Sequence, residues 1–137
     1  MKFLLIDDDE EDATIFCEAL NDIDAGIICD YEPDPLLAIS RVSDTDTKTD
    51  LIFLDLNMPV MDGWEVLNLF KDNHHIKSIP VIIYSTSPLE RDISKAKTMG
   101  AAFYFAKPMD FIELREQLQR IVTAFEEQKL DQVKLSR

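Results

Sequence analysis

Short, largely apolar runs alternate along the chain with segments in which apolar residues recur every three or four positions. Such runs are typical of strands buried on both faces, and the recurring spacing is typical of amphipathic helices. The predicted strands cover residues 3–6, 26–31, 51–54, 81–84 and 102–105. Because a helical segment follows each strand, the pattern predicts an α/β fold with a doubly wound, five-stranded parallel sheet and five helices.

The helical segments carry their own start and stop signals. Asp34 and Pro35 mark a helix start, because Asp is a favoured N-cap and Pro fits the first helical position. Gly100 marks a helix end. The predicted helices cover about residues 13–23, 36–42, 63–71, 89–96 and 111–125.

Residues 1–126 are expected to form one domain with its own core. Hydrophobic residues make up 46% of the 137-residue chain, which argues against disorder. Residues 127–137 mix charges with few apolar positions, so we expect them to extend the last helix or to fray.

The net charge of −13 argues against binding to nucleic acid or to an anionic membrane, and permits binding of cations and basic partner surfaces. No apolar stretch approaches the roughly 18 residues of a membrane span, and the apolar start is too short for a signal peptide. We therefore expect a cytoplasmic protein. Cys17 and Cys29 form no C-x-x-C pair, and we interpret them as core thiols in a reducing compartment.

Polar residues follow the predicted strands where each one ends. Asp7 and Asp8 follow the first strand, Asp55 the third, Ser85 the fourth and Lys107 the fifth. A doubly wound sheet binds its ligands beyond the carboxyl ends of its strands. The sequence therefore predicts that three carboxylates, a hydroxyl and an ammonium group converge at one edge of the sheet.

Such a cluster needs a counter-charge. Two carboxylates about 4 Å apart repel each other by roughly 4 kcal/mol at an effective dielectric constant of about 20. Lys107 offsets one of the three charges, and the remainder suits a divalent cation. Oxygen ligands favour Mg²⁺, with Mn²⁺ possible, over zinc.

Asp55 follows a predicted central strand and can act as a nucleophile toward phosphorus, forming an acyl phosphate. The chain has only three glycines and neither a P-loop nor a G-x-G-x-x-G motif. A nucleotide site is therefore not expected, and the phosphoryl group must arrive on another molecule.

Four segments in order give the chain a family resemblance: 3–8, 54–63, 80–85 and 107–108. Together they resemble the response-regulator receiver domains of two-component signalling, from about residue 2 to residue 125. The resemblance implies a flavodoxin-like sheet of strand order 2-1-3-4-5. It also implies a single-domain, chemotaxis-type regulator rather than an enzyme, one that catalyses only its own phosphorylation and dephosphorylation.

The resemblance assigns roles to the clustered residues. Asp55 is the expected phosphoacceptor. Asp8 and Asp55 are expected to bind Mg²⁺ directly, together with the main-chain carbonyl of Asn57, whereas Asp7 contributes through water. Lys107 is expected to pair with Asp55 and later with the phosphoryl group.

The resemblance also implies a switch. Ser85 matches the switch hydroxyl and Tyr104 the switch aromatic. The Lys107–Pro108 peptide bond is expected to be cis. Phosphorylation would then change the face formed by the fourth helix, fifth strand and fifth helix, where a downstream protein binds.

Other polar residues receive plainer interpretations. Six consecutive acidic residues occupy positions 7–12, and beyond the first two we interpret them as solvated charges at a helix N-terminus, with Asp9 a lesser candidate ligand. His74 and His75 lie in a polar loop and are interpreted as surface residues rather than metal ligands or a phosphohistidine site.

The expected phosphodonor is a histidine kinase or a histidine phosphotransfer protein. One alternative is a phosphorelay intermediate that passes its phosphoryl group to another histidine. Another is a Mg²⁺-dependent phosphatase, which usually needs a general acid two positions after the nucleophile, where this chain has Asn57. A third is a degenerate receiver that binds partners without phosphorylation, although no acid, lysine or hydroxyl is missing.

Overall fold

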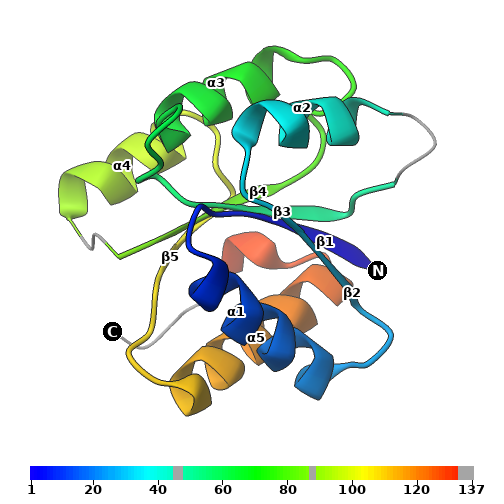
Figure 1. The fold of residues 1–137 in the computed structure, drawn as a ribbon. Coiled ribbons are helices and arrows are strands. Elements are labelled where there is room, and N and C mark those ends of the chain that lie inside the picture. The colour runs from blue at the N-terminus through cyan, green and yellow to red at the C-terminus, as the bar shows by residue number, and fades with distance from the viewer. Residues whose placement is uncertain (45–47, 87–88, 133–137) are drawn as a thin grey trace.

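Five parallel strands form one sheet in the order β2-β1-β3-β4-β5 in a computed structural model of the chain (Figure 1). The structure describes residues 1–44, 48–86 and 89–132. The predicted fold class and strand order are confirmed. The strands are β1 Lys2–Ile6, β2 Ile28–Glu32, β3 Leu51–Leu54, β4 Val81–Ser85 and β5 Phe103–Ala106.

Helices cover both faces of the sheet: α1 and α5 lie on one face, and α2, α3 and α4 on the other (Figure 1). Each of α1, α2, α3 and α5 is preceded by an aspartate whose side chain accepts a backbone N–H of the first turn. No helix in the described part of the chain combines the length and apolar character that a membrane crossing needs. The helices are α1 Glu10–Ile23, α2 Pro35–Ser43, α3 Gly63–Asp72, α4 Glu90–Thr98 and α5 Phe111–Glu126.

The sheet separates two hydrophobic clusters, because successive strand side chains point to opposite faces. Phe3, Phe53 and Phe105 pack beneath α1 and α5, with Tyr84 among them. Tyr104 lies on the other face, against the cluster beneath α2, α3 and α4. On that second face, α3 and α4 also meet directly. The Lys95 ammonium of α4 lies 4.5 Å from the centroid of the Trp64 ring of α3.

Helix α1 begins at Glu10, three residues before the predicted start, because Asp9 caps it. The Asp9 carboxylate accepts the backbone N–H of Asp12 at 3.1 Å. Three acidic residues then fill the first turn, where the helix dipole favours negative charge. The cap therefore brings the acidic run into the helix, directly above the end of β1.

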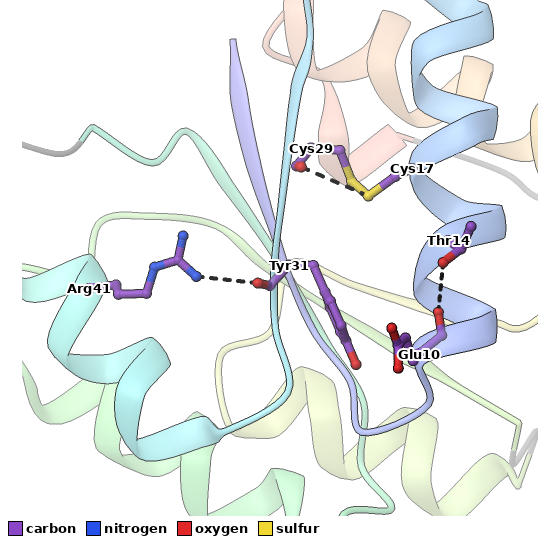
Figure 2. The surroundings of a disulfide bond; sticks show 6 residues. All are labelled: Glu10, Thr14, Cys17, Cys29, Tyr31 and Arg41. Atoms are coloured by element: carbon purple, nitrogen blue, oxygen red, sulfur yellow. Dashed lines mark hydrogen bonds between the residues drawn. A yellow bond between two sulfur atoms is a disulfide. The ribbon is translucent and has the colours of Figure 1, made fainter.

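Cys17 and Cys29 form a disulfide that links α1 to β2, so the prediction of two core thiols was wrong (Figure 2). Their Cα atoms are 5.5 Å apart, within the range that a disulfide spans. Both residues are half-buried. The side chains meet because α1 packs along the edge strand, and Tyr31, two residues after Cys29, turns toward the same helix in Figure 2.

The chain turns after α5 instead of continuing the helix. Gln128 has a φ angle of 59°, and a short 3₁₀ helix, η1, follows at Leu130–Gln132. Leu130 packs against the cluster beneath α1 and α5. Of the two alternatives predicted for residues 127–137, an extended helix or a frayed tail, the extended α-helix is not found at 127–132, and residues 133–137 lie outside the described residues.

Candidate functional site

Three carboxylates gather at the carboxyl ends of the central strands. Asp7 and Asp8 follow β1, Asp55 follows β3, and one oxygen of each lies within 4.8 Å of the others. Asp7 is fully buried and Asp55 is 4% exposed, whereas Asp8 is exposed. The cluster therefore combines two buried acids with one that opens to solvent.

Backbone contacts continue the sheet ladder into the site. The N–H of Asp55 donates to the carbonyl of Ile6 at 2.9 Å, and the N–H of Lys107 donates to the carbonyl of Ser85 at 2.8 Å. These bonds hold the start of each loop in line with its strand. The sheet therefore fixes where the acidic and basic groups leave the backbone.

Gly63 places the start of α3 directly against Asp55. Its N–H donates to the carbonyl of Leu56 at 2.9 Å. A Cβ atom at position 63 would lie 2.4 Å from the Asp55 carbonyl oxygen and 2.6 Å from Leu56 Cα. Only glycine fits this backbone approach, so α3 supports the loop that carries the central acid.

Lys107 lies among the acids but does not contact them equally. Its Nζ is 2.8 Å from Asp7 Oδ2, 3.0 Å from Asp12 Oδ2 and 3.8 Å from Asp55 Oδ2. The contact with Asp55, which the family resemblance implied, is the longest of the three. The Lys107 side chain is 9% exposed, and its ammonium lies 5.2 Å from the centroid of the Tyr84 ring.

The sequence interpretation of Asp12 as a solvated charge at a helix N-terminus was wrong, because its carboxylate pairs with the Lys107 ammonium. With Asp9 as the N-cap, Asp12 is the third helical residue of α1. Side chains at this position point back toward the N-terminus of their helix. The three-residue spacing between the capping Asp9 and Asp12 was therefore a sequence signal that the Asp12 side chain turns toward the strand ends.

Burial dominates the electrostatics of the central acid. Burial raises the pKa of the Asp55 carboxyl to about 7, the charge of Lys107 opposes this rise, and the charge of Asp7 adds to it. For Lys107, burial lowers the pKa, but the hydrogen bond to Asp7 and the charges of Asp55 and Asp7 outweigh it and leave the pKa above its ordinary value. Lys107 is thus a cation at neutral pH, whereas the charge of Asp55 changes near neutral pH.

Ser85 and Asn57 close the site on the β4 side. The Asn57 amide donates to the Ser85 hydroxyl oxygen at 3.3 Å, and the backbone N–H of Asn57 donates to Asp55 Oδ1 at 3.3 Å. Ser85 is fully buried and Asn57 is exposed. The hydroxyl accepts in this arrangement, and no contact among the described residues engages its proton, which could therefore be donated to an acceptor placed near Asp55.

The structure contradicts the predicted cis peptide bond and confirms that the two histidines lie on the surface. No peptide bond among the described residues is cis, so the Lys107–Pro108 bond is trans and the expectation of a cis bond was wrong. The trans form is the preferred one even before proline, by about 0.5–1 kcal/mol. His74 and His75 are exposed in the segment between α3 and β4, at the end of the sheet opposite the acids.

The donor set fits a hard divalent cation. The three clustered acids offer only carboxylate oxygens, and the main-chain carbonyl of Asn57 follows two residues after Asp55. Oxygen donors at an open, negatively charged site suit Mg²⁺ or Mn²⁺ better than zinc. With Asp12 included, the acids outnumber Lys107 by three charges, which strengthens the need for a cation.

A model of the response regulator receiver domain family matches residues 3–119. Among solved structures, that of the phosphorylated cyanobacterial phytochrome response regulator RcpA has a TM-score of 0.79 and 30% identity, and covers 99% of this chain and 98% of its own. The Mn²⁺-bound form of response regulator Rcp1 has a TM-score of 0.78 and 28% identity, with 99% of each chain covered.

Curated relatives extend the likeness to longer proteins. The transcriptional activator protein IrlR of Burkholderia pseudomallei (strain 1026b) is 30% identical over 122 residues, which are 89% of this chain and 50% of IrlR. The chain thus spans about half the length of the first curated relatives that it matches.

Proposed function

The chain belongs to the response regulator receiver domain family, and from this membership we propose that Asp55 accepts a phosphoryl group from a phosphorylated histidine of a partner protein. Receiver domains are signalling modules of two-component systems. The donor would be a histidine kinase or a histidine phosphotransfer protein, as expected from the sequence.

The observation that carries this proposal is the placement of Asp55. It is a nearly buried carboxylate at the end of a central strand, grouped with Asp7 and Asp8 and 3.8 Å from the Lys107 ammonium. Phosphoryl transfer depends on positioning and on neutralising charge more than on acid–base chemistry. The strand supplies the position, and Lys107 supplies a fixed positive charge.

In the proposed step, a carboxylate oxygen of Asp55 bonds to phosphorus while the bond from phosphorus to the donor imidazole nitrogen breaks. The nitrogen keeps the electron pair, and the imidazole leaves neutral because its other nitrogen carries a proton. The Ser85 hydroxyl can then donate a hydrogen bond to a phosphoryl oxygen. Lys107 remains charged throughout because its pKa is raised.

Mg²⁺ would be held by Asp8, Asp55 and the Asn57 carbonyl, and would supply charge neutralisation at the phosphoryl oxygens. Both carboxylate oxygens of Asp7 are already engaged. Oδ1 accepts the backbone N–H of Asp9 at 2.9 Å, and Oδ2 accepts the Lys107 ammonium at 2.8 Å. This occupancy supports an indirect contribution of Asp7 through water, in line with the family resemblance.

The output is proposed to pass through the face formed by α4, β5 and α5. Ser85 ends β4 and Tyr104 lies in the neighbouring strand β5, paired in register with Ile83. A hydroxyl drawn toward a phosphoryl group would open space that the half-buried Tyr104 ring can enter. A downstream protein, rather than nucleic acid or membrane, is the expected recipient of the change.

Intact-mass spectrometry tests the proposal directly. After incubation with acetyl phosphate and MgCl₂, we expect the protein to gain the mass of one phosphoryl group, and Asp55→Asn to gain none. Asp72→Asn, which makes the same change at the exposed end of α3, should behave like the wild type. An unchanged wild-type mass, or a gain that persists in Asp55→Asn, would rule the proposal out.

A further inference from the structure

Lys107 is held by an acid outside the strand-end cluster, and this arrangement has a consequence for phosphorylation. We propose that Asp12 is a positioning residue that restrains Lys107 in the resting protein and must release it when a phosphoryl group reaches Asp55. The inference rests on the proposed function of Asp55, and it assigns a role to a residue of α1.

The Lys107 ammonium lies closer to Asp7 and Asp12 than to Asp55. Nζ donates to Asp7 at 2.8 Å and to Asp12 at 3.0 Å, whereas its 3.8 Å separation from Asp55 exceeds a hydrogen bond. An ammonium has three donors, and two are committed to acids other than the proposed phosphoacceptor. In the resting protein, Lys107 is therefore held short of Asp55.

The two acids that hold Lys107, Asp7 and Asp12, differ in burial. The Asp7 side chain is fully buried and Asp7 also accepts the N–H of Asp9, so its contact with Lys107 belongs to the framework. The Asp12 side chain is 38% exposed. Water screens the contact with this half-exposed carboxylate more than the contact with the buried Asp7. Asp12 is therefore the partner that Lys107 can leave.

The α1 cap does not depend on the Asp12 side chain, so Asp12 can be substituted at little cost to the fold. Its N–H, not its side chain, takes part in the cap with Asp9. The carboxylate of Asp12 is thus free of the cap and directed to Lys107. A doubly charged phosphoryl group on Asp55 would attract the ammonium more strongly than the single charge of Asp12, and Lys107 would then move toward Asp55.

Removal of the Asp12 carboxylate should therefore make Lys107 available before phosphorylation. Removing any acidic side chain near the site also weakens the repulsion between the protein and an anionic phosphodonor, so a matched control is needed. Glu11 is exposed and lies one residue earlier in the same helical turn, and the described ion pairs of Lys107 do not include it. Glu11→Gln removes the same charge without touching the contact.

The first measurement reads the contact without metal or phosphate. In metal-free protein, the NMR signal of the Lys107 ammonium should shift in Asp12→Asn and stay in place in Glu11→Gln. Asp12→Ser, which removes the carboxylate and keeps a short polar side chain, should shift the signal in the same way. An unmoved signal in both Asp12 variants would overturn the inference.

The second measurement follows phosphorylation by acetyl phosphate with MgCl₂. A bond forms between an Asp55 oxygen and phosphorus, the bond from phosphorus to the acetate oxygen breaks, and acetate leaves with the electron pair. We expect Asp12→Asn to be phosphorylated about two- to fivefold faster than Glu11→Gln, the size expected for releasing a partly exposed ion pair.

The outcomes separate the two proposals. If the wild type is phosphorylated but Asp12→Asn is no faster than Glu11→Gln, only the role of Asp12 is overturned. If the wild type is not phosphorylated at all, the proposed function of Asp55 fails, and the role of Asp12 fails with it.

Discussion

Single residues at the strand ends determine both the geometry and the cost of the site. Asp55 is nearly buried beside Asp7, and Gly63 lets α3 approach the Asp55 backbone closely. Asp55 is the proposed phosphoacceptor, and its burial makes ionisation costly. Gly63 leaves space that no side chain can occupy. Both features lead to measurable effects.

Gly63→Ala should destabilise the protein and slow phosphorylation together. The added Cβ would meet the Asp55 carbonyl oxygen at 2.4 Å, so the loop behind the acid must shift. We expect a loss of about 1–3 kcal/mol in the free energy of unfolding, measured by urea denaturation. Gly26→Ala is the control, because its Cβ would meet only the exposed Asp24 side chain, at 3.2 Å. Equal stability of the two variants would contradict the steric role of Gly63.

Asp55→Asn should stabilise the metal-free protein at pH 8 more than at pH 5. The folded-state pKa of Asp55 is about 7, above the ordinary value of 3.8. Ionisation therefore costs stability progressively as the pH rises from about 4 to about 7, and the full cost remains above that range. The gain in Asp55→Asn should be on the order of 1–3 kcal/mol at pH 8. Urea denaturation in EDTA measures it, with Asp72→Asn as control, and a pH-independent difference would contradict the prediction.

At the scale of elements, α1 joins several features of the molecule. Its cap at Asp9 places Asp12 over the site, and Cys17 ties its middle to β2. The helix also packs against α5, where Arg115 pairs with Asp22. Helix α1 thus connects the edge strand, the site and the last helix.

Loss of the disulfide should lower stability without changing the fold. The two cysteines are 12 residues apart in sequence, and closing a loop of about this size stabilises a protein by roughly 3 kcal/mol. The double variant Cys17→Ser, Cys29→Ser should unfold at a lower urea concentration than the oxidised wild type. A reductant should lower the urea concentration at which the wild type unfolds to that of the double variant, and should leave the double variant unchanged. A wild type insensitive to reductant would show that the bond contributes no stability.

At the scale of the whole molecule, the alternation of strands and helices was enough to predict a doubly wound parallel sheet, and the family resemblance added its strand order. Five short, largely apolar runs separated by helical patterns predict a parallel sheet, and its carboxyl edge gathers the residues that follow the strands. The contacts of Asp12 and the Cys17–Cys29 bond were not predicted. Both depend on where α1 lies relative to the sheet, and a hydrophobic pattern specifies which face is buried but not how far a helix slides along it.

Mg²⁺ should stabilise the whole molecule through the acidic edge, and EDTA should remove the effect. A ligand that binds only the folded state adds about 2.7 kcal/mol at a concentration 100-fold above its dissociation constant. The melting temperature of the wild type should therefore rise with MgCl₂. Asp72→Asn should follow the wild type, whereas Asp55→Asn, with one carboxylate fewer in the cluster, should respond much less. An equal rise in Asp55→Asn would argue against a cation at this edge.

The contact between Lys95 and Trp64 gives the molecule an optical reporter. Trp64 is the one tryptophan of the sequence, and the Lys95 ammonium of α4 lies 4.5 Å from its ring. The indole is therefore the one tryptophan fluorophore of the chain, and its emission depends on the distance to a charge on α4, a helix of the proposed output face. Measuring the fluorescence of Trp64 in unlabelled protein should therefore report displacement of α4 in real time.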